Sequence, residues 1–155
     1  MDFTERYSRQ IMLPELGAEG QKRLSASKVL LIGAGGLGSP IATYLTAAGI
    51  GTLGIIDADK VSESNLQRQT LYSEDEIGMS KVECACKRLQ RLNGNVKINV
   101  YDCFLTADNA EEIISGYDII VDGCDNFATR FIVNDTCLSL CKPYVYGSIQ
   151  GLNGQ

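Results

Sequence analysis

The sequence predicts an α/β fold: a Rossmann-like, doubly wound and mainly parallel sheet with helices on both faces and an N-terminal helical segment. Three observations support this. Short apolar runs alternate with helical segments along the chain, which is the order of βαβ units with right-handed crossovers. Several runs are apolar throughout, as strands buried on both faces are. The first run leads directly into the glycine-rich turn "GAGGLG" (33–38) and a helix.

Local signals place each element in order. Gly49 is positioned to end a helix in the left-handed conformation. "SEDE" (73–76) has the form of a capping box, and Ser80 can begin a helix that runs to about Leu92. We expect strands at 28–32, 52–57, 96–103, 117–122 and 143–149, and helices within 4–10, 14–27, 36–49, 80–92, 106–116 and 126–142.

The composition indicates one domain, residues 1–155, of an ordinary globular protein. Hydrophobic residues make up 45% and charged residues 21%. The net charge of -5 argues against broad nucleic-acid binding but leaves room for a small basic pocket. The most apolar stretch, residues 29–45, is interrupted by glycines and a proline, so we expect no membrane span there.

The N-terminus lacks the apolar segment of a signal peptide, and the six cysteines contain no C-x-x-C pair. We therefore expect a cytoplasmic protein whose thiols are reduced and mostly belong to the core.

The glycine turn predicts a nucleotide site. Gly33 permits the tight turn, Gly35 lets the backbone approach a phosphate, and Gly38 lets the helix pack close to the strand. Asp57 follows at the end of the second expected strand, where a carboxylate accepts the ribose hydroxyls. These features alone leave the kind of nucleotide open.

Cations and amides beyond Asp57 favour a triphosphate ligand. Arg68, with Asn65 and Gln67 beside it in "SNLQRQ" (64–69), is a candidate phosphate-binding group, and both amides are candidate nucleotide ligands. The planar guanidinium suits two phosphate oxygens, and the compact charge of Lys81 adds to it.

Asp125 follows the expected strand 117–122 and is a candidate magnesium ligand. Because ligands in open α/β sheets bind at the carboxyl ends of strands, Asp57 and Asp125 are expected to flank one crevice with the glycine turn between them.

Structural roles compete with each of these assignments. Arg68 could be a surface cation or pair with Glu63. Lys81 could be a solvated lysine, although a cation at a helix N-terminus is unfavourable and favours an anionic partner. Asp125 could serve only as the cap of the helix that follows.

Two other functions also fit a glycine turn followed by an acid: an NAD-dependent oxidoreductase and a non-catalytic nucleotide-binding module. The chain has no histidine and no Tyr-x-x-x-Lys spacing, the common acid–base groups beside nicotinamide. Both observations weaken the oxidoreductase hypothesis without removing it.

Five motifs in order, "RYSRQ", "GAGGLGSP", "DADKVSESNLQRQ", "GMSKVE" and "DGCDN", give the chain a strong resemblance to the ThiF/MoeB/HesA adenylyltransferases, bacterial relatives of ubiquitin-activating enzymes. The resemblance runs from Arg6 to the end of the chain. It implies that ATP and Mg²⁺ are used to adenylate the C-terminal Gly-Gly carboxylate of a ubiquitin-like sulfur-carrier protein. Thiamin, molybdopterin and related sulfur-transfer pathways are all compatible with it.

The resemblance also implies residue roles. Gly36 lies in the nucleotide turn and Asp57 matches the ribose-binding acid. Asp125, with Asn126 beside it, matches the magnesium-associated acid. The phosphate-binding groups are matched by Asn65, Arg68 and Lys81. Arg9 matches an arginine that reaches across a homodimer interface to the neighbouring ATP.

We expect this chain to be the N-terminal portion of a longer protein. Many family members bind a structural Zn²⁺ through two C-x-x-C pairs, and this chain contains no such pair. The spacing of Cys124, Cys137 and Cys141 does not match one, so we assign no zinc ligands in these residues.

Overall fold

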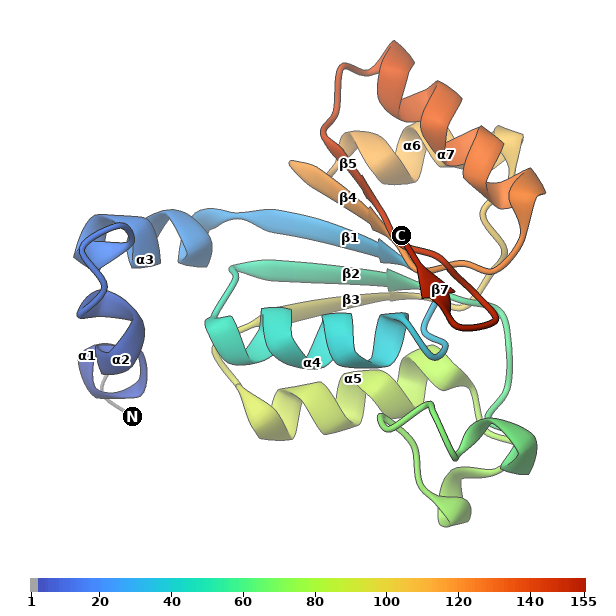
Figure 1. Cartoon of the computed structure of the whole chain (residues 1–155), viewed down its shortest axis with the longest axis horizontal. Coiled ribbons are helices and arrows are strands. Elements are labelled where there is room, and N and C mark those ends of the chain that lie inside the picture. Colours follow the sequence, from blue (N-terminus) through green and yellow to red (C-terminus); the bar gives the residue numbers. More distant parts are fainter. Residues whose placement is uncertain (1–2) are drawn as a thin grey trace.

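The computed structural model describes residues 3–155 and contains a five-stranded parallel sheet in the order β3-β2-β1-β4-β5 (Figure 1). Each of the five predicted segments contains one strand of this sheet, and each neighbouring pair is parallel. The strands are β1 (Lys28–Ile32), β2 (Thr52–Ile56), β3 (Lys97–Tyr101), β4 (Ile119–Asp122) and β5 (Tyr144–Tyr146). The strand order reverses on either side of β1, which makes the fold doubly wound, as predicted.

Helices cover both faces of the sheet. On one face, α4 (Gly38–Ala48) and α5 (Lys81–Leu92) pack over β1, β2 and β3 around Leu31, Leu53 and Leu89. On the other face, α6 (Ala107–Ser115) and α7 (Phe127–Ser139) enclose a second core. The alternating side chains of β1 contribute to both cores, because its central position buries it on both sides.

The N-terminal helices α1 (Phe3–Arg6), α2 (Ser8–Ile11) and α3 (Gly17–Ala26) lie beyond the amino ends of the strands (Figure 1). Tyr7 is 2% exposed, and its hydroxyl accepts a hydrogen bond of 2.7 Å from Asn93 Nδ2 at the end of α5. The ring of Tyr7 also occupies the space beside Gly49 that a side chain would need. These contacts attach the N-terminal segment to the end of the sheet opposite the strand carboxyl ends.

Most predicted helix boundaries are confirmed. Gly49 ends α4 with φ 83°, and Ser73 and Glu76 form a capping box on the short 3₁₀ helix Glu74–Glu76. A second 3₁₀ turn covers Glu63–Asn65. Ser80 precedes α5, as predicted, but its side chain makes no cap hydrogen bond. Helix α7 ends at Ser139, and the chain turns at Cys141, which has φ 51°.

The last predicted strand, 143–149, is divided in two. The strand β5 ends at Tyr146, and β6 (Ile149–Gln150) pairs antiparallel with β7 (Asn153–Gly154) in a separate hairpin. Because β4 ends at Asp122, residues beyond Gly147 have no partner in the main sheet. They pair instead with the final residues, and Gly151, with φ 59°, forms the turn between them.

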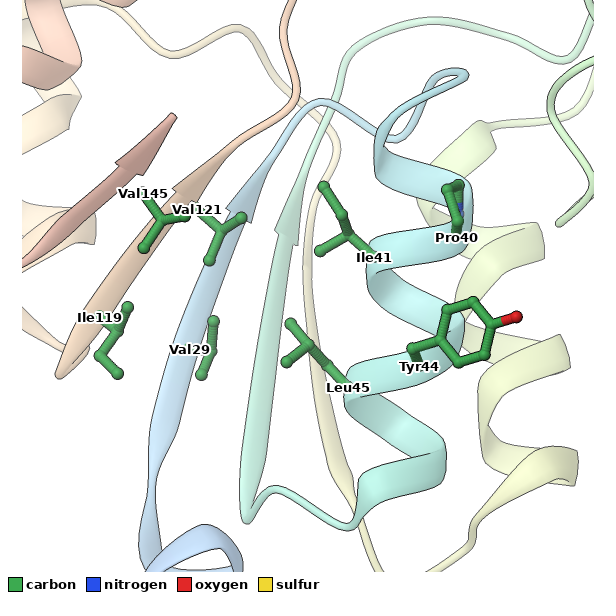
Figure 2. Close-up of a pocket in the computed structure, with 8 residues that line it drawn as sticks. All are labelled: Val29, Pro40, Ile41, Tyr44, Leu45, Ile119, Val121 and Val145. Atoms are coloured by element: carbon green, nitrogen blue, oxygen red, sulfur yellow. The ribbon is translucent and has the colours of Figure 1, made fainter. Parts of the chain in front are cut away.

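An apolar groove of about 500 Å³ lies where α4 leaves β4 and β5 uncovered (Figure 2). It is bounded by the strand residues Val29, Ile119, Val121 and Val145 and by the helix residues Pro40, Ile41, Tyr44 and Leu45. Tyr44 is 74% and Val145 is 54% exposed. Within residues 3–155 no helix is both long enough and apolar enough to span a bilayer.

Candidate functional site

A cavity of about 890 Å³ lies at the carboxyl ends of β1, β2 and β4. The glycine turn after β1, Asp57 after β2 and Asp125 after β4 all line it. Since β1 lies between β2 and β4 in the sheet, the turn separates the two aspartates. The volume and position are those of ligand sites in open α/β sheets.

The glycine turn is shaped by backbone contacts that exclude side chains. Gly33 has φ 87°, and a Cβ there would be 3.1 Å from the backbone of Gly123 and Cys124. A Cβ on Gly38 would collide with the carbonyl oxygen of Gly33, so close helix–strand packing requires glycine there. Gly33, Gly35 and Gly36 line the cavity, whereas Gly38, the first residue of α4, does not.

Asp57 is bound to the glycine turn and to its own loop. Its Oδ2 accepts a 2.8 Å hydrogen bond from the backbone N–H of Ala34, and its Oδ1 accepts one of 2.8 Å from Asp59 N. Each carboxylate oxygen retains a second lone pair for a ligand hydroxyl. The geometry therefore fixes the carboxylate before any ligand binds.

Lys81 is buried, so the alternative that it is a solvated lysine is wrong. Its side chain is 4% exposed, and Nζ forms a 2.8 Å ion pair with Oδ2 of Asp59, whose side chain is 59% exposed. The backbone N–H of Lys81 also donates to Asp59 O at 3.1 Å. Asp59, which sequence reasoning did not single out, thus positions the lysine at the edge of the cavity.

The 64–69 segment contributes side chains selectively. Asn65 and Arg68 line the cavity, and so does Gln69, which sequence reasoning did not assign. The predicted nucleotide ligand Gln67 lies outside it, and its Nε2 donates to Ser64 O at 3.2 Å.

The exposed Arg68 is not paired with Glu63. Its Nη1 donates to Ser64 O and to Gln67 Oε1, both at 3.3 Å. The described residues contain no ion pair between Arg68 and Glu63. The guanidinium charge is therefore uncompensated by a carboxylate and faces the cavity.

Asp125 is not the cap of α7. Asn126 takes that role, because its Oδ1 accepts a 2.9 Å hydrogen bond from Thr129 N. The Asp125 side chain is exposed and lines the cavity. The cap-only interpretation of Asp125 is wrong, and its carboxylate is free to bind a ligand or a cation.

Arg130 is a further cavity residue with no motif to reveal it. Its Nη2 donates to Cys124 O at 2.7 Å and to Gly147 O at 2.9 Å, and Nε lies 3.8 Å from Oδ2 of the fully buried Asp122. The guanidinium also lies 4.6 Å from the ring centroid of Tyr146. It therefore ties the loop before α7 to the end of β5.

Acidic and basic side chains line the cavity in equal number. The lining contains the acids Asp57, Asp59 and Asp125 and the cations Arg68, Lys81 and Arg130. Within the described part of the chain, no three potential ligand side chains converge on one metal position. Mg²⁺ commonly binds through one or two carboxylates together with substrate phosphates, so a single carboxylate suits it.

Arg9 lies far from this chain's own cavity. It is exposed on α2, at the end of the sheet opposite the strand carboxyl ends, and it does not line the cavity (Figure 1). A role at a nucleotide would therefore require the cavity of another subunit.

Half of the six cysteines are buried core residues. Cys84, Cys124 and Cys137 are buried, and all six thiols are free. Burial, together with a contact to Asp122, raises the pKa of Cys124 to about 11.

The ThiF family model matches residues 7–155. This chain belongs to the ThiF family. The five-motif resemblance is thereby confirmed, and the parallel sheet and cavity are features of a ThiF-family chain.

Two curated relatives are close in sequence. The chain is 48% identical to the "Sulfur carrier protein adenylyltransferase" of Thermus thermophilus over 97% of this chain and 56% of that protein. It is 50% identical to the "Adenylyltransferase and sulfurtransferase MOCS3" of Aedes aegypti over 97% of this chain and 34% of that protein. The ThiF-family chain therefore spans about half or less of the length of these relatives.

A solved structure is also similar. Escherichia coli tRNA N6-threonylcarbamoyladenosine dehydratase, TcdA, in complex with ATP, superposes with a TM-score of 0.91 at 27% identity. The match covers 97% of this chain and 62% of TcdA. An ATP complex of the same fold is thus known.

Proposed function

We propose that the protein adenylates the C-terminal glycine carboxylate of a ubiquitin-like sulfur-carrier protein at the expense of ATP. The observation that carries this proposal is the 48–50% identity with relatives named as sulfur-carrier adenylyltransferases and as MOCS3. The cavity supports it, because the glycine turn, Asp57, Arg68, Lys81 and Asp125 line a single space.

The reaction needs no general base. A carrier carboxylate oxygen attacks the α-phosphorus, the bond to the bridging oxygen of the β-phosphate breaks, and pyrophosphate leaves with that electron pair. The nucleophile is already an anion near neutral pH, so no proton has to be removed. Catalysis then consists of positioning and charge stabilisation, which agrees with a chain that contains no histidine.

We assign the residues by their places in the cavity. Asp57 accepts the ribose hydroxyls, and the backbone around Gly35 and Gly36 approaches the phosphates. Asn65, Arg68 and Lys81 bind the triphosphate and stabilise the charge on the leaving pyrophosphate. Within this proposal, Lys81 exchanges part of its contact with Asp59 for a phosphate oxygen.

Asp125 fits a magnesium ligand, because its exposed carboxylate lines the cavity without serving as the α7 cap. Asn126 holds the adjoining loop through its cap hydrogen bond. When bound, Mg²⁺ shields the negative charge of the triphosphate.

The proposed assembly is a homodimer in which Arg9 enters the cavity of the partner subunit. Mixing Arg9→Ala and Asp125→Ala proteins tests this, because only a mixed dimer contains one site with both residues intact. Subunit exchange should restore about a quarter of wild-type activity if dimers form at random. Activity that stays at the level of the separate variants would contradict a shared site.

The carrier itself is proposed to end in Gly-Gly and to serve thiamin, molybdopterin or a related sulfur-transfer pathway in the cytoplasm. The relatives' names support a sulfur carrier in general. Pyrophosphate exchange measured with candidate carriers, each compared with a form lacking its last glycine, would identify the substrate.

ATP–pyrophosphate exchange stimulated by a carrier is the direct test of function. Arg68→Ala should abolish exchange while leaving the melting temperature unchanged, because Arg68 is exposed. Arg91→Ala, an exposed arginine on α5, is the matched control and should retain wild-type exchange. Wild-type exchange in Arg68→Ala would contradict the proposed mechanism.

Calorimetric titration separates the other two functions. An oxidoreductase would bind NAD with an affinity unaffected by Arg68→Ala. A nucleotide-binding module would bind ATP without catalysing exchange in the presence of any carrier.

A further inference from the structure

Both polar groups of the Ala34 backbone are bound by side chains from other parts of the chain. Its N–H donates to Oδ2 of Asp57 at 2.8 Å, and its carbonyl oxygen accepts a 2.7 Å hydrogen bond from the hydroxyl of Tyr72. Ala34 is fully buried and Tyr72 is 7% exposed, so water does not compete for the carbonyl contact. Two distant side chains therefore fix the orientation of this residue within the glycine turn.

The contact with Tyr72 determines where the next backbone N–H points. The described residues contain no cis peptide bond, and in a trans peptide the carbonyl oxygen and the following N–H point in opposite directions. The carbonyl oxygen of Ala34 points toward the buried hydroxyl of Tyr72. The N–H of Gly35 therefore points away from that hydroxyl, and Gly35 lines the cavity.

The next peptide presents a second N–H in the same way. The carbonyl oxygen of Gly35 accepts a 2.9 Å hydrogen bond from the N–H of Ser39 in the first turn of α4, so the N–H of Gly36 points out beyond the start of that helix. Within residues 3–155, neither the Gly35 nor the Gly36 N–H donates a hydrogen bond. Unpaired N–H groups at the start of a helix are suited to phosphate oxygens.

The two N–H groups are not held equally well. The helix itself orients the N–H of Gly36, whereas the N–H of Gly35 depends on a tyrosine 38 residues away from Ala34. Glycine accepts either sign of φ, so Gly35 offers little steric resistance to a flip of the peptide before it. A flipped peptide would turn the Ala34 carbonyl oxygen toward the cavity, where it would repel a phosphate.

We propose that Tyr72 is a positioning residue for ATP binding, whose hydroxyl holds the Ala34–Gly35 peptide so that the Gly35 N–H faces the phosphate chain. The inference deepens the proposed function and rests on its claim that the cavity binds ATP. Tyr72 does not line the cavity, so it acts through the backbone and not by contact with the ligand. Burial raises the pKa of Tyr72, and the nearby Asp57 adds to this, so the phenol keeps its proton and remains a donor.

Tyr72→Phe removes the hydroxyl and keeps the ring that packs in the core. Calorimetry should show ATP binding weakened about fivefold, which corresponds to the loss of one neutral hydrogen bond that favours the binding orientation. Tyr101→Phe is the matched control, because it also removes a hydrogen-bonded hydroxyl, 3.0 Å from that of Tyr117, but does not line the cavity. Wild-type ATP affinity in Tyr72→Phe would overturn the inference.

Adenosine distinguishes this role from a general loss of structure. The N–H of Ala34 belongs to the preceding peptide, so its hydrogen bond to Asp57 does not depend on the Ala34–Gly35 orientation. Ligand-observed NMR should therefore find the same adenosine affinity in Tyr72→Phe and in the wild type. Equal weakening of ATP and adenosine binding would show that Tyr72 only supports the fold and would overturn the inference.

Hydrogen exchange followed by NMR tests the orientation in the wild-type protein, without any substitution. The Gly35 amide should exchange rapidly in the free protein, because it has no partner there, and ATP should protect it whereas adenosine should not. A Gly35 amide that bound ATP leaves unprotected would overturn the inference but not the proposed function. A wild-type protein that binds no ATP in calorimetry would overturn both.

Discussion

The two sides of the cavity are built differently. The turn side, made of residues 33–38, 57–59, 65–69 and Lys81, is tied together by short contacts, including the hydrogen bonds of Asp57 and the Lys81–Asp59 ion pair. The α7 side, made of residues 123–130 and 146–150, combines one partly buried and hydrogen-bonded residue, Arg130, with exposed groups. Phe127 is 75% and Ile149 is 67% exposed there.

This difference indicates that the two sides of the cavity are suited to different ligands. Rigid groups on the turn side are suited to a small, invariant ligand such as a triphosphate, because preorganised charges need little rearrangement on binding. Exposed apolar and acidic groups on the α7 side are suited to a larger partner that covers them when it binds. The proposed carrier protein would then approach from the α7 side.

Among substitutions on the α7 side, the largest effect on exchange is expected from Asp125→Ala. Removing the proposed magnesium ligand should lower carrier-stimulated pyrophosphate exchange by about 10²–10³-fold, the range for losing one electrostatic stabiliser of a transition state. The melting temperature should not change, because Asp125 is exposed and does not cap α7. Asp135→Ala, which removes an exposed aspartate within α7, is the control. Equal exchange rates in the two variants would eliminate Asp125 from the mechanism.

Arg130→Met should remove the contacts that tie the loop before α7 to the end of β5. It leaves the buried carboxylate of Asp122 without its cation and frees the carbonyl oxygens of Cys124 and Gly147. Removing one partner of a buried ion pair should lower the free energy of unfolding by about 3 kcal/mol, measured by urea denaturation. Arg88→Met, at an exposed position on α5, should change it little. If both variants were equally stable, these contacts would not stabilise the fold.

Lys81→Met should weaken ATP binding by about 2 kcal/mol, the loss of a charged hydrogen bond to phosphate. The fold should survive, because the partner left behind, Asp59, is 59% exposed and can be hydrated. Asp59→Asn keeps an acceptor for Lys81 and should have a smaller effect than Lys81→Met. Calorimetry can rank the two, and a larger loss in Asp59→Asn would mean that Asp59 itself contacts the ligand.

The smallest effect concerns Cys124 at the base of the α7 side. Its pKa is raised from 9.0 to about 11, mainly by burial, so little reactive thiolate is present at pH 8. The raised pKa stabilises the folded state below about pH 9, and this contribution is lost as the pH rises through about 11. Mass spectrometry after brief iodoacetamide treatment at pH 8 should find the exposed Cys141 labelled before Cys124. The reverse order would show that the α7 side opens in solution.

The sequence alone was sufficient for the sheet, the glycine turn and the family. Apolar runs, helix caps and glycine spacing are local signals, and Gly49, the Ser73–Glu76 capping box and all five strands follow them. The sequence also predicted that Asp57 and Asp125 would line one cavity, because parallel strands bring their carboxyl ends to one edge of the sheet.

Only the tertiary structure decided which side chains of the irregular segments face the cavity. Gln69 rather than Gln67 lines it, because Tyr72 reaches Ala34, 38 residues away, and sets the orientation of the segment. Lys81 can be buried because Asp59 pairs with its charge. At the start of α7, Asn126 rather than Asp125 accepts the hydrogen bond from the Thr129 N–H. Loops have no repeating period to show which way a side chain points, so contacts between distant residues determine it.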